Sequence, residues 1–142
     1  MTPSFGSPVL GTMVRLLTPF LLTFSAYVAV HGHTSPGGGF QAGAALGSGL
    51  ILIRLVGGPG TWGLSREAAL RLACAGCLAY AWIGWLSLAY GAPAFDYSAL
   101  PLPAEGAARR ALGSLGIELG VLVTVSSVMV LIFDSLSSRR EA

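Results

Sequence analysis

Charged residues are scarce in this chain of 142 residues, and lysine is absent. Only 10% of the residues are charged, whereas soluble domains contain about 25%. Eight arginines and six acidic residues leave a formal net charge of +2, which is far too small for a nucleic-acid-binding surface. The two cysteines, Cys74 and Cys77, are too few for a disulfide scaffold. These shortages exclude a nucleic-acid-binding domain and a disulfide-stabilised secreted domain.

Hydrophobic residues make up 54% of the chain and occur in blocks long enough to cross a membrane. A transmembrane helix needs about 20 apolar residues. The blocks are continuous rather than alternating, which favours helices over barrel strands. We therefore predict an all-α integral membrane protein, one membrane domain over residues 1–142 with no room for a separate catalytic domain. The four predicted transmembrane helices cover residues 9–30, 40–57, 68–90 and 112–133.

The distribution of arginine predicts how the chain is oriented. Six arginines lie on one side of the four-span topology, and only Arg109 and Arg110 lie on the other. Because basic residues concentrate on the cytoplasmic side, we expect both termini and the 58–67 connection in the cytoplasm. The other two connections are then expected outside. The six arginines are Arg15, Arg54, Arg66, Arg71, Arg139 and Arg140.

Glycine recurs every four residues on two of the predicted spans. Gly39, Gly43 and Gly47 form one stripe, and Gly116 and Gly120 form another. Small residues at this spacing let two helix backbones approach closely. Glycine is also simply frequent in membrane helices, but two separate stripes favour packing. We expect the stripes to pack against helices of this chain or of partner subunits.

Cys74 and Cys77 form a CAGC sequence that superficially matches redox and metal-binding motifs. Metal sites with this spacing normally need a second pair of ligands, and the chain has no further cysteine. We therefore interpret both cysteines as structural residues of the third span and expect no bound metal.

The connection between the first two spans has the sequence HGHTSPGGGF at residues 31–40. Pro36 fixes φ, and the glycines permit backbone angles that other residues avoid. Irregular backbone at membrane depth must be buried in protein or line a wet cavity. His31 and His33 could suggest a metal, but no third ligand is nearby, and a hydrogen-bonded pair is the favoured alternative.

These residues resemble the signature of the MrpB/MnhB subunit of Mrp-type (also called Mnh-type) sodium/proton antiporters. A second match, Gly-Ile-Glu-Leu-Gly-Val at residues 116–121, lies in the fourth span. Both stand in the expected order and spacing, so the resemblance covers nearly the whole chain. His31 is not part of the signature. The matching residues of the first segment are Gly32, His33, Pro36, Gly37, Gly38, Gly39, Phe40 and Gly43.

The resemblance implies a small accessory subunit of a complex that exchanges external protons for internal sodium. Its implied partners are the A, C and D subunits, further small subunits and the lipid bilayer, with Na⁺ and H⁺ as the ions that the complex transports. It implies a transporter subunit rather than an enzyme, without a cofactor, in a bacterial or archaeal cell membrane.

Two alternatives differ from an antiporter subunit. The same subunit type occurs in membrane-bound hydrogenases and related respiratory complexes, whose redox groups lie on other chains. A stand-alone membrane enzyme or metal channel would use His31, His33 and the cysteine pair, and the residues favour it least.

Glu118 is the only ionised residue predicted within the fourth span. It lies six residues from the start of that span, about 9 Å along a helix, toward the same outer side as His31 and His33. Carboxyls and histidines within membranes are costly and are the usual members of proton relays. Two roles therefore stay open: Glu118 relays protons together with the histidines, or it hydrogen-bonds a neighbouring subunit and moves nothing.

Overall fold

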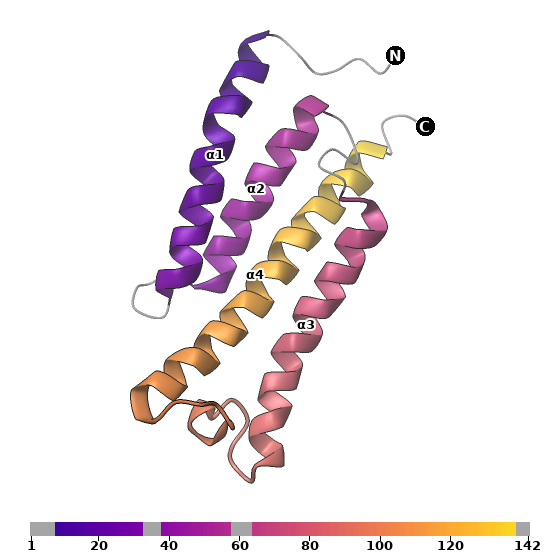
Figure 1. The fold of residues 1–142 in the computed structure, drawn as a ribbon. Coiled ribbons are helices and arrows are strands. Elements are labelled where there is room, and N and C mark those ends of the chain that lie inside the picture. Colours follow the sequence, from indigo (N-terminus) through magenta and orange to yellow (C-terminus); the bar gives the residue numbers. More distant parts are fainter. Residues whose placement is uncertain (1–7, 33–37, 58–63, 139–142) are drawn as a thin grey trace.

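The computed structural model describes residues 8–32, 38–57 and 64–138 (Figure 1). Four helices in these ranges are long and apolar enough to cross a membrane, and no strand occurs among the described residues. The predicted all-α membrane fold is therefore confirmed. The elements are α1 (Pro8–His31), α2 (Gly39–Gly57), α3 (Arg66–Ala89), the short 3₁₀ helix η3 (Tyr97–Ala99) and α4 (Gly106–Ser138).

Helix α4 differs most from its predicted span, because it begins at Gly106 rather than at residue 112 and ends at Ser138 rather than at 133. The segment Ala-Ala-Arg-Arg-Ala after Gly106 contains good helix formers and no proline, so nothing stops the helix there. Its 33 residues span about 50 Å at 1.5 Å per residue. The hydrocarbon core is only about 30 Å thick, so α4 is longer than a perpendicular span requires.

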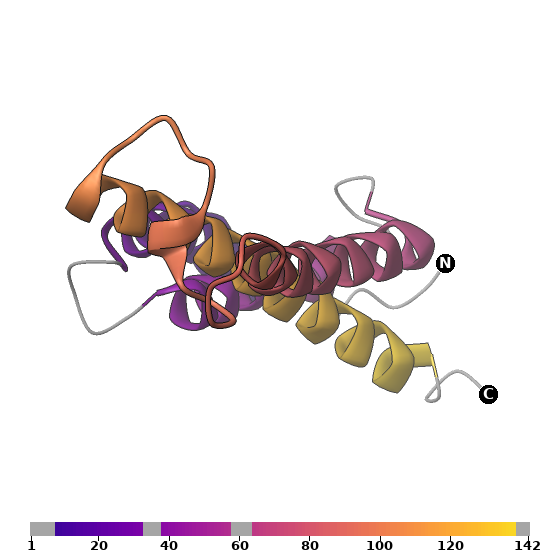
Figure 2. The same ribbon diagram turned by 90° about the horizontal axis from the view of Figure 1, so that it is seen from below.

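The helices lie side by side in the order α1, α2, α4, α3 (Figure 1). Helix α4 packs against both α2 and α3, whereas α1 packs mainly against α2. Helices α2 and α4 run in the same direction (Figure 1). The start of α1 and the end of α4 lie at one end of the bundle, and the α3–α4 connection with η3 lies at the other (Figures 1 and 2). Which end faces the cytoplasm stays a prediction.

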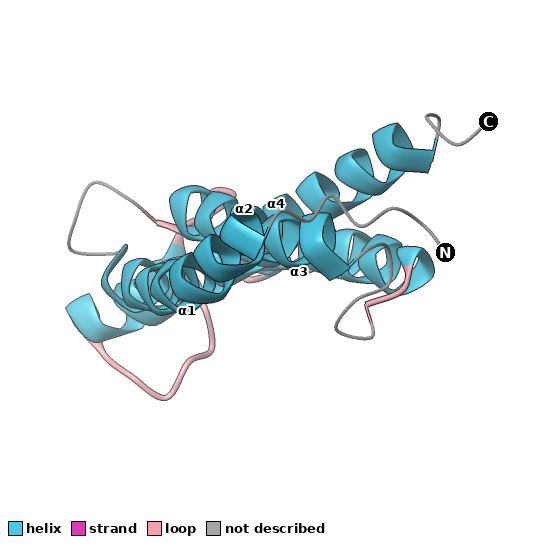
Figure 3. Cartoon of the chain, turned by 90° about the horizontal axis from the view of Figure 1, so that it is seen from above, coloured by secondary structure: helices cyan, strands magenta, loops and turns pink. Residues whose placement is uncertain are grey.

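Small side chains form the interior of the bundle, and large apolar side chains point outward. Ala42 and Ala69 are fully buried, whereas Phe20, Trp82 and Leu78 are at least 60% exposed. Seen from above, the last turns of α4, next to the end marked C, project beyond the other helices (Figure 3). This distribution is expected where the outer faces contact lipid tails or other membrane subunits, and where close helix contacts require small residues.

Candidate functional site

The glycine stripe of α2 packs directly against α4 of the same chain. A Cβ atom at Gly39 would overlap the main chain of Glu118. A Cβ at Gly43 would lie 2.8 Å from the carbonyl oxygen of Leu122 and 3.0 Å from the Cβ of Val125. These separations leave no room for a side chain, so the two backbones touch. The sequence left open whether this stripe meets the same chain or a partner, and here it meets the same chain.

The contact continues toward the ends of both helices. A Cβ at Gly47 would lie 2.9 Å from the Sδ of Met129 and 3.3 Å from the Cα of Ser126. Together, these close contacts form what we call the α2–α4 seam. It consists of Gly39, Gly43 and Gly47 on α2 and Glu118, Leu122, Val125, Ser126 and Met129 on α4.

The glycines of α4 face the opposite neighbour, α3. A Cβ at Gly120 would lie 3.0 Å from the carbonyl oxygen of Gly76, and a Cβ at Gly116 would lie 3.0 Å from Cδ1 of Ile83. The Thr124 hydroxyl, next on the same stripe, lies 2.9 Å from the Gly120 carbonyl oxygen, to which it donates. Helix α4 is thus held closely on two faces, which fixes the direction of the side chains that it carries.

The carboxyl group of Glu118 lies against the residues that flank the glycine-rich connection. A Cβ at Gly32 would overlap its Oε2 atom, and a Cβ at Gly38 would lie 3.5 Å from its Cδ. Gly38 also has a φ of +90°, a conformation that side chains disfavour. Glycine at position 39 therefore lets the main chain of Glu118 approach, glycine at position 32 leaves room for its carboxyl group, and glycine at position 38 supplies the backbone angle that precedes α2. The two segments that resemble the antiporter signature meet at this carboxyl group.

Glu118 has one hydrogen-bond donor within the described ranges. The hydroxyl of Ser114, one turn earlier on α4, donates to Oε1 at 3.3 Å. The other oxygen, Oε2, is buried, and no donor in residues 8–32, 38–57 or 64–138 reaches it. Leaving a buried acceptor unsatisfied costs about 1–3 kcal/mol. We call Glu118, Ser114 and the three surrounding glycines (Gly32, Gly38, Gly39) the Glu118 site.

Of the two histidines near the glycine-rich connection, the structure describes only His31. His31 is the last residue of α1 and is exposed, with its Nδ1 3.1 Å from the carbonyl oxygen of Tyr27. Its ring also stacks on the Tyr27 ring with the centroids 4.5 Å apart. His33, Pro36 and Gly37 lie outside the described residues, so a role of His33 beside Glu118 stays a prediction. Phe40, the last residue of the loop motif, is 65% exposed at the start of α2.

Cys74 and Cys77 are both exposed on α3 and are not joined in a disulfide. Within the part of the chain that the structure describes, no group of three or more His, Cys, Asp or Glu side chains is placed to hold a metal ion.

Tyr97 of η3 lies at the same end of the bundle as the Glu118 site and was not singled out from the sequence. It packs on α4, where a Cβ at Gly113 would lie 2.7 Å from the Cβ of Tyr97. Burial raises the pKa of Tyr97, and the charges of Tyr80 and Glu118 raise it further. Its phenol therefore stays protonated at physiological pH. No sequence pattern placed η3 on α4, so this neighbour could only be found in the structure.

The connection between α3 and α4 is ordered by its own polar contacts. The main-chain N–H and the hydroxyl of Ser98 both donate to Oδ1 of Asp96, at 2.9 and 2.6 Å. These hydrogen bonds lower the pKa of the Asp96 carboxyl. Arg109 donates to the Ser98 carbonyl oxygen at 3.1 Å and so ties the connection to the start of α4. An arginine that the sequence treated only as a topological charge thus has a structural role.

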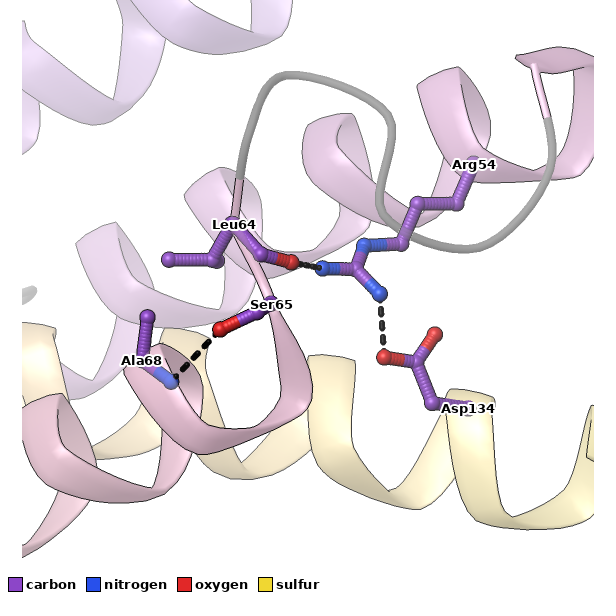
Figure 4. A network of polar contacts seen from close by, with 5 residues as sticks. All are labelled: Arg54, Leu64, Ser65, Ala68 and Asp134. Carbon is purple, nitrogen blue, oxygen red and sulfur yellow. Dashed lines mark hydrogen bonds and ion pairs between the residues drawn. The ribbon is translucent and has the colours of Figure 1, made fainter.

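A buried ion pair between Arg54 and Asp134 lies beyond the other end of the seam (Figure 4). The sequence reasoning missed it, because it treated Arg54 as a topological charge and ended the fourth span before Asp134. A signal was present in the sequence. Arg54 lies near the end of the second predicted span, and the oppositely charged Asp134 directly follows the fourth, at the same end of the topology. Glu118 and this pair are therefore the charged groups at the two ends of one helix contact.

Comparison with known proteins identifies relatives over the whole fold. Residues 9–131 match a family described as "Domain related to MnhB subunit of Na+/H+ antiporter". The B subunit of the Na(+)/H(+) antiporter from Bacillus subtilis (strain 168) is 30% identical over 133 residues, which are 90% of this chain and 91% of that protein. The Staphylococcus aureus (strain MRSA252) protein named as antiporter subunit mnhB2 is 33% identical over 135 residues, 93% and 95% of the two chains. The corresponding B subunit from Alkalihalophilus pseudofirmus is 43% identical over 47 residues, 33% of each chain.

Proposed function

Because the chain belongs to the family with a domain related to the MnhB subunit of Na⁺/H⁺ antiporters, we propose that it is an accessory membrane subunit of a multi-subunit sodium/proton antiporter. It supports the assembly of that complex and its exchange of cations for protons. Its neighbours are then the A, C and D subunits and the small ones. The membrane is that of a bacterial or archaeal cell, with both termini in the cytoplasm.

The observation that carries a direct role in ion movement is the Glu118 site. A carboxyl group within an apolar helix is costly and is usually retained for function. Gly32 and Gly39 leave room for this one, and only Ser114 donates to it among the described residues. A carboxyl that served packing alone would be expected to have both oxygens satisfied. The open Oε2 atom supports a group that exchanges a proton.

In this proposal Glu118 binds and releases a proton on the outer side of the complex, and His33 exchanges it with the aqueous phase. His31, which already contacts Tyr27, is a weaker member of the same path. In the alternative role, Oε2 of Glu118 accepts a hydrogen bond from a neighbouring subunit and no proton moves. Substitution by glutamine distinguishes the two roles, because glutamine can hydrogen-bond but cannot titrate.

The outer surface supports an assembly role. Phe24 and Tyr27 on α1 and Trp85 and Leu88 on α3 are all more than half exposed. Such side chains fit membrane helices whose outer faces contact other apolar helices as well as lipid. The subunit would then lie beside larger chains rather than act alone.

Two experiments test the proposed membership. The chain is expressed in its own host, purified in mild detergent, and every co-migrating chain is identified. Antiporter subunits without redox subunits support the proposal, whereas iron–sulfur or nickel-site subunits would assign the chain to a membrane-bound hydrogenase or related respiratory complex. In a deletion strain, the wild-type chain should restore sodium-dependent proton movement in everted vesicles. Unchanged transport after the deletion would contradict the proposal.

A further inference from the structure

The ion pair of Arg54 and Asp134 joins three separate segments at one end of the bundle (Figure 4). The guanidinium of Arg54, in the last turn of α2, donates to Oδ2 of Asp134 on α4. Its other terminal nitrogen lies 2.5 Å from the carbonyl oxygen of Leu64, to which it also donates, just before the Ser65 cap of α3. Both side chains are buried, with 2% of the Arg54 and 10% of the Asp134 side chain exposed.

We propose that this ion pair fixes the register of α2 against α4 and thereby holds the glycines of the Glu118 site around the Glu118 carboxyl group. Arg54 and Asp134 are positioning residues in this inference, since they touch neither the transported ion nor Glu118. The role for Glu118 rests on the proposed function, but the register itself can be measured without transport.

Stability alone does not account for the pair. Removing two charges from water is expensive, and well-packed apolar residues often serve as well or better in the same place. Oδ1 of Asp134 is buried, and no donor in the described part of the chain reaches it, so the pair is also incompletely satisfied. A buried ion pair can instead select one register of two helices, because a register that leaves either charge buried and unpaired is penalised strongly. A role in selecting one arrangement therefore fits these contacts better than a role in overall stability.

The rest of the seam cannot make that choice by itself. Its glycines recur every four residues, at positions 39, 43 and 47, so sliding α2 by one turn replaces a glycine with the next glycine at two of the three contacts. A slip of this kind is about 6 Å at 1.5 Å per residue. It keeps the close backbone contact but separates Arg54 from Asp134. The ion pair thus adds a distinction between registers that the glycine stripe matches at two of its three contacts.

The observed register is uniform along the whole contact. The α4 partner stands 79 residues further along the chain at each glycine: 39 faces 118, 43 faces 122, and 47 faces 126. Arg54 and Asp134 stand 80 residues apart in sequence. One register therefore satisfies both ends of the seam. A slip at the ion pair would carry Gly39 away from Glu118, although Glu118 and Asp134 stand 16 positions apart on α4, about 24 Å along the helix.

Disulfide cross-linking between α2 and α4 measures the register. In a chain whose two native cysteines are replaced by alanine, G47C/M129C reports the observed register, because a Cβ at Gly47 lies 3.1 Å from the Cβ of Met129. The substitution of Met129 also removes the Sδ atom that would crowd the new side chain. The matched probes G47C/V125C and G47C/F133C, each with Met129→Ala so that the crowding Sδ atom is absent from them as well, report a slip of one turn in either direction. All three are measured in the assembled complex in native membranes.

The decisive variant is R54M/D134L, which replaces the pair by apolar side chains of similar size. We expect normal abundance of the complex, a rise of about fivefold in one of the slipped cross-links, and reduced proton movement, because nothing then selects the register. The swapped variant R54D/D134R should restore the observed cross-link. If R54M/D134L does not assemble, the single R54M variant in the same assay should show the slip.

Two results would overturn the inference. One is an unchanged cross-linking pattern in R54M/D134L at normal abundance. The other is a slipped pattern in R54D/D134R together with an unslipped one in R54M. Failure of the proposed function gives a different result, namely a slipped cross-link in R54M/D134L with unaltered proton movement.

Discussion

The carboxyl group of Glu118 occupies the space that a side chain at Gly32 would fill. Gly32 follows the last residue of α1, and Glu118 lies near the middle of α4, so the contact joins segments more than 80 residues apart in sequence. It also gives a reason for glycine at this position that does not depend on backbone flexibility. The glycine motif and the Glu-Leu-Gly segment form parts of one site.

The Gly32→Ala substitution should displace the Glu118 carboxyl group. The new Cβ overlaps Oε2 and would lie 2.6 Å from the Cα of Gly38, so it also presses on the main chain beside the carboxyl group. Overpacking of this kind typically costs about 1–3 kcal/mol. We expect reduced sodium-dependent proton movement in everted vesicles with most of the complex still assembled. Gly11→Ala on α1, the helix that ends just before Gly32, is the matched control, because its Cβ would meet nothing within 4 Å. Equal activity of the two variants would contradict the contact's importance.

The Gly43→Leu substitution should disrupt the α2–α4 seam. A Cβ at this position already lies 2.8 Å from the Leu122 carbonyl oxygen, so a leucine must separate the two backbones. We expect a severalfold loss of intact complex on native gels, in line with the cost of overpacking a close contact, about 1–3 kcal/mol. Gly11→Leu, on an open surface of α1, should assemble normally. Recovery of intact complex with Gly43→Leu would argue against the seam as an assembly element.

The orientation of the chain is tested by labelling single cysteines in a background without the native pair. Ala94, exposed in the α3–α4 connection, should be labelled from outside the cell when replaced by cysteine. Ser137, near the end of α4, should be labelled only after the membrane is opened. The reverse pattern would place Glu118 toward the cytoplasm and overturn the arginine-based orientation.

Asp96 caps the start of η3, and its lowered pKa predicts how the order of the α3–α4 connection depends on pH. Hydrogen bonds from Ser98 lower the pKa of Asp96 below the ordinary value of 3.8, so the cap favours the ionised carboxyl. Its stabilising effect is complete above pH 3.8 and disappears as the pH falls through the lowered value. Asp96→Ala should make the connection more accessible to protease at neutral pH, as measured by digestion from the outer side. A wild-type-like digestion rate at neutral pH would show that the cap does not order the connection.

The four transmembrane helices could be predicted from sequence because each consists of a long apolar run, and run length alone identifies a membrane span. The ends of α4 could not be predicted from the apolar run. The helix begins before that run, at Gly106, and continues after it, from Asp134 to Ser138. The spacing of Gly39, Gly43 and Gly47 indicated a close helix contact but not its partner, because small residues permit approach by any helix.

Part of the candidate site could likewise be predicted from the sequence, and part could not. Glu118 was found from sequence because a carboxyl in an apolar span stands out. Its contacts with Gly32 and Gly38 depend on where α4 packs, and its proximity to Tyr97 depends on where η3 packs. No local sequence pattern predicts either position. The pairing of Arg54 with Asp134 depends on the register of two parallel helices.

If Glu118 exchanges protons through His33, then a substitution of His33 in the glycine-rich connection should also reduce antiport. His33→Ala should reduce antiport less than loss of the carboxyl, because water can take the place of the group that exchanges protons with the aqueous phase. The variant is compared at equal complex abundance with Phe40→Leu, a change at an exposed position of the same segment. A defect in both variants would indicate damage to the segment rather than a relay.

The most direct test of the account is Glu118→Gln, with sodium-dependent proton movement in everted vesicles and complex abundance measured on the same membranes. Glutamine preserves the shape of the side chain and its hydrogen bonds but cannot titrate. We expect normal abundance with antiport reduced about tenfold or more, since a relay without its titrating group loses a proton-transfer step. Glu118→Ala, which leaves Ser114 without its acceptor, should in addition reduce assembly. Full sodium-dependent proton movement by Glu118→Gln at normal abundance would contradict the relay and leave Glu118 as a packing residue.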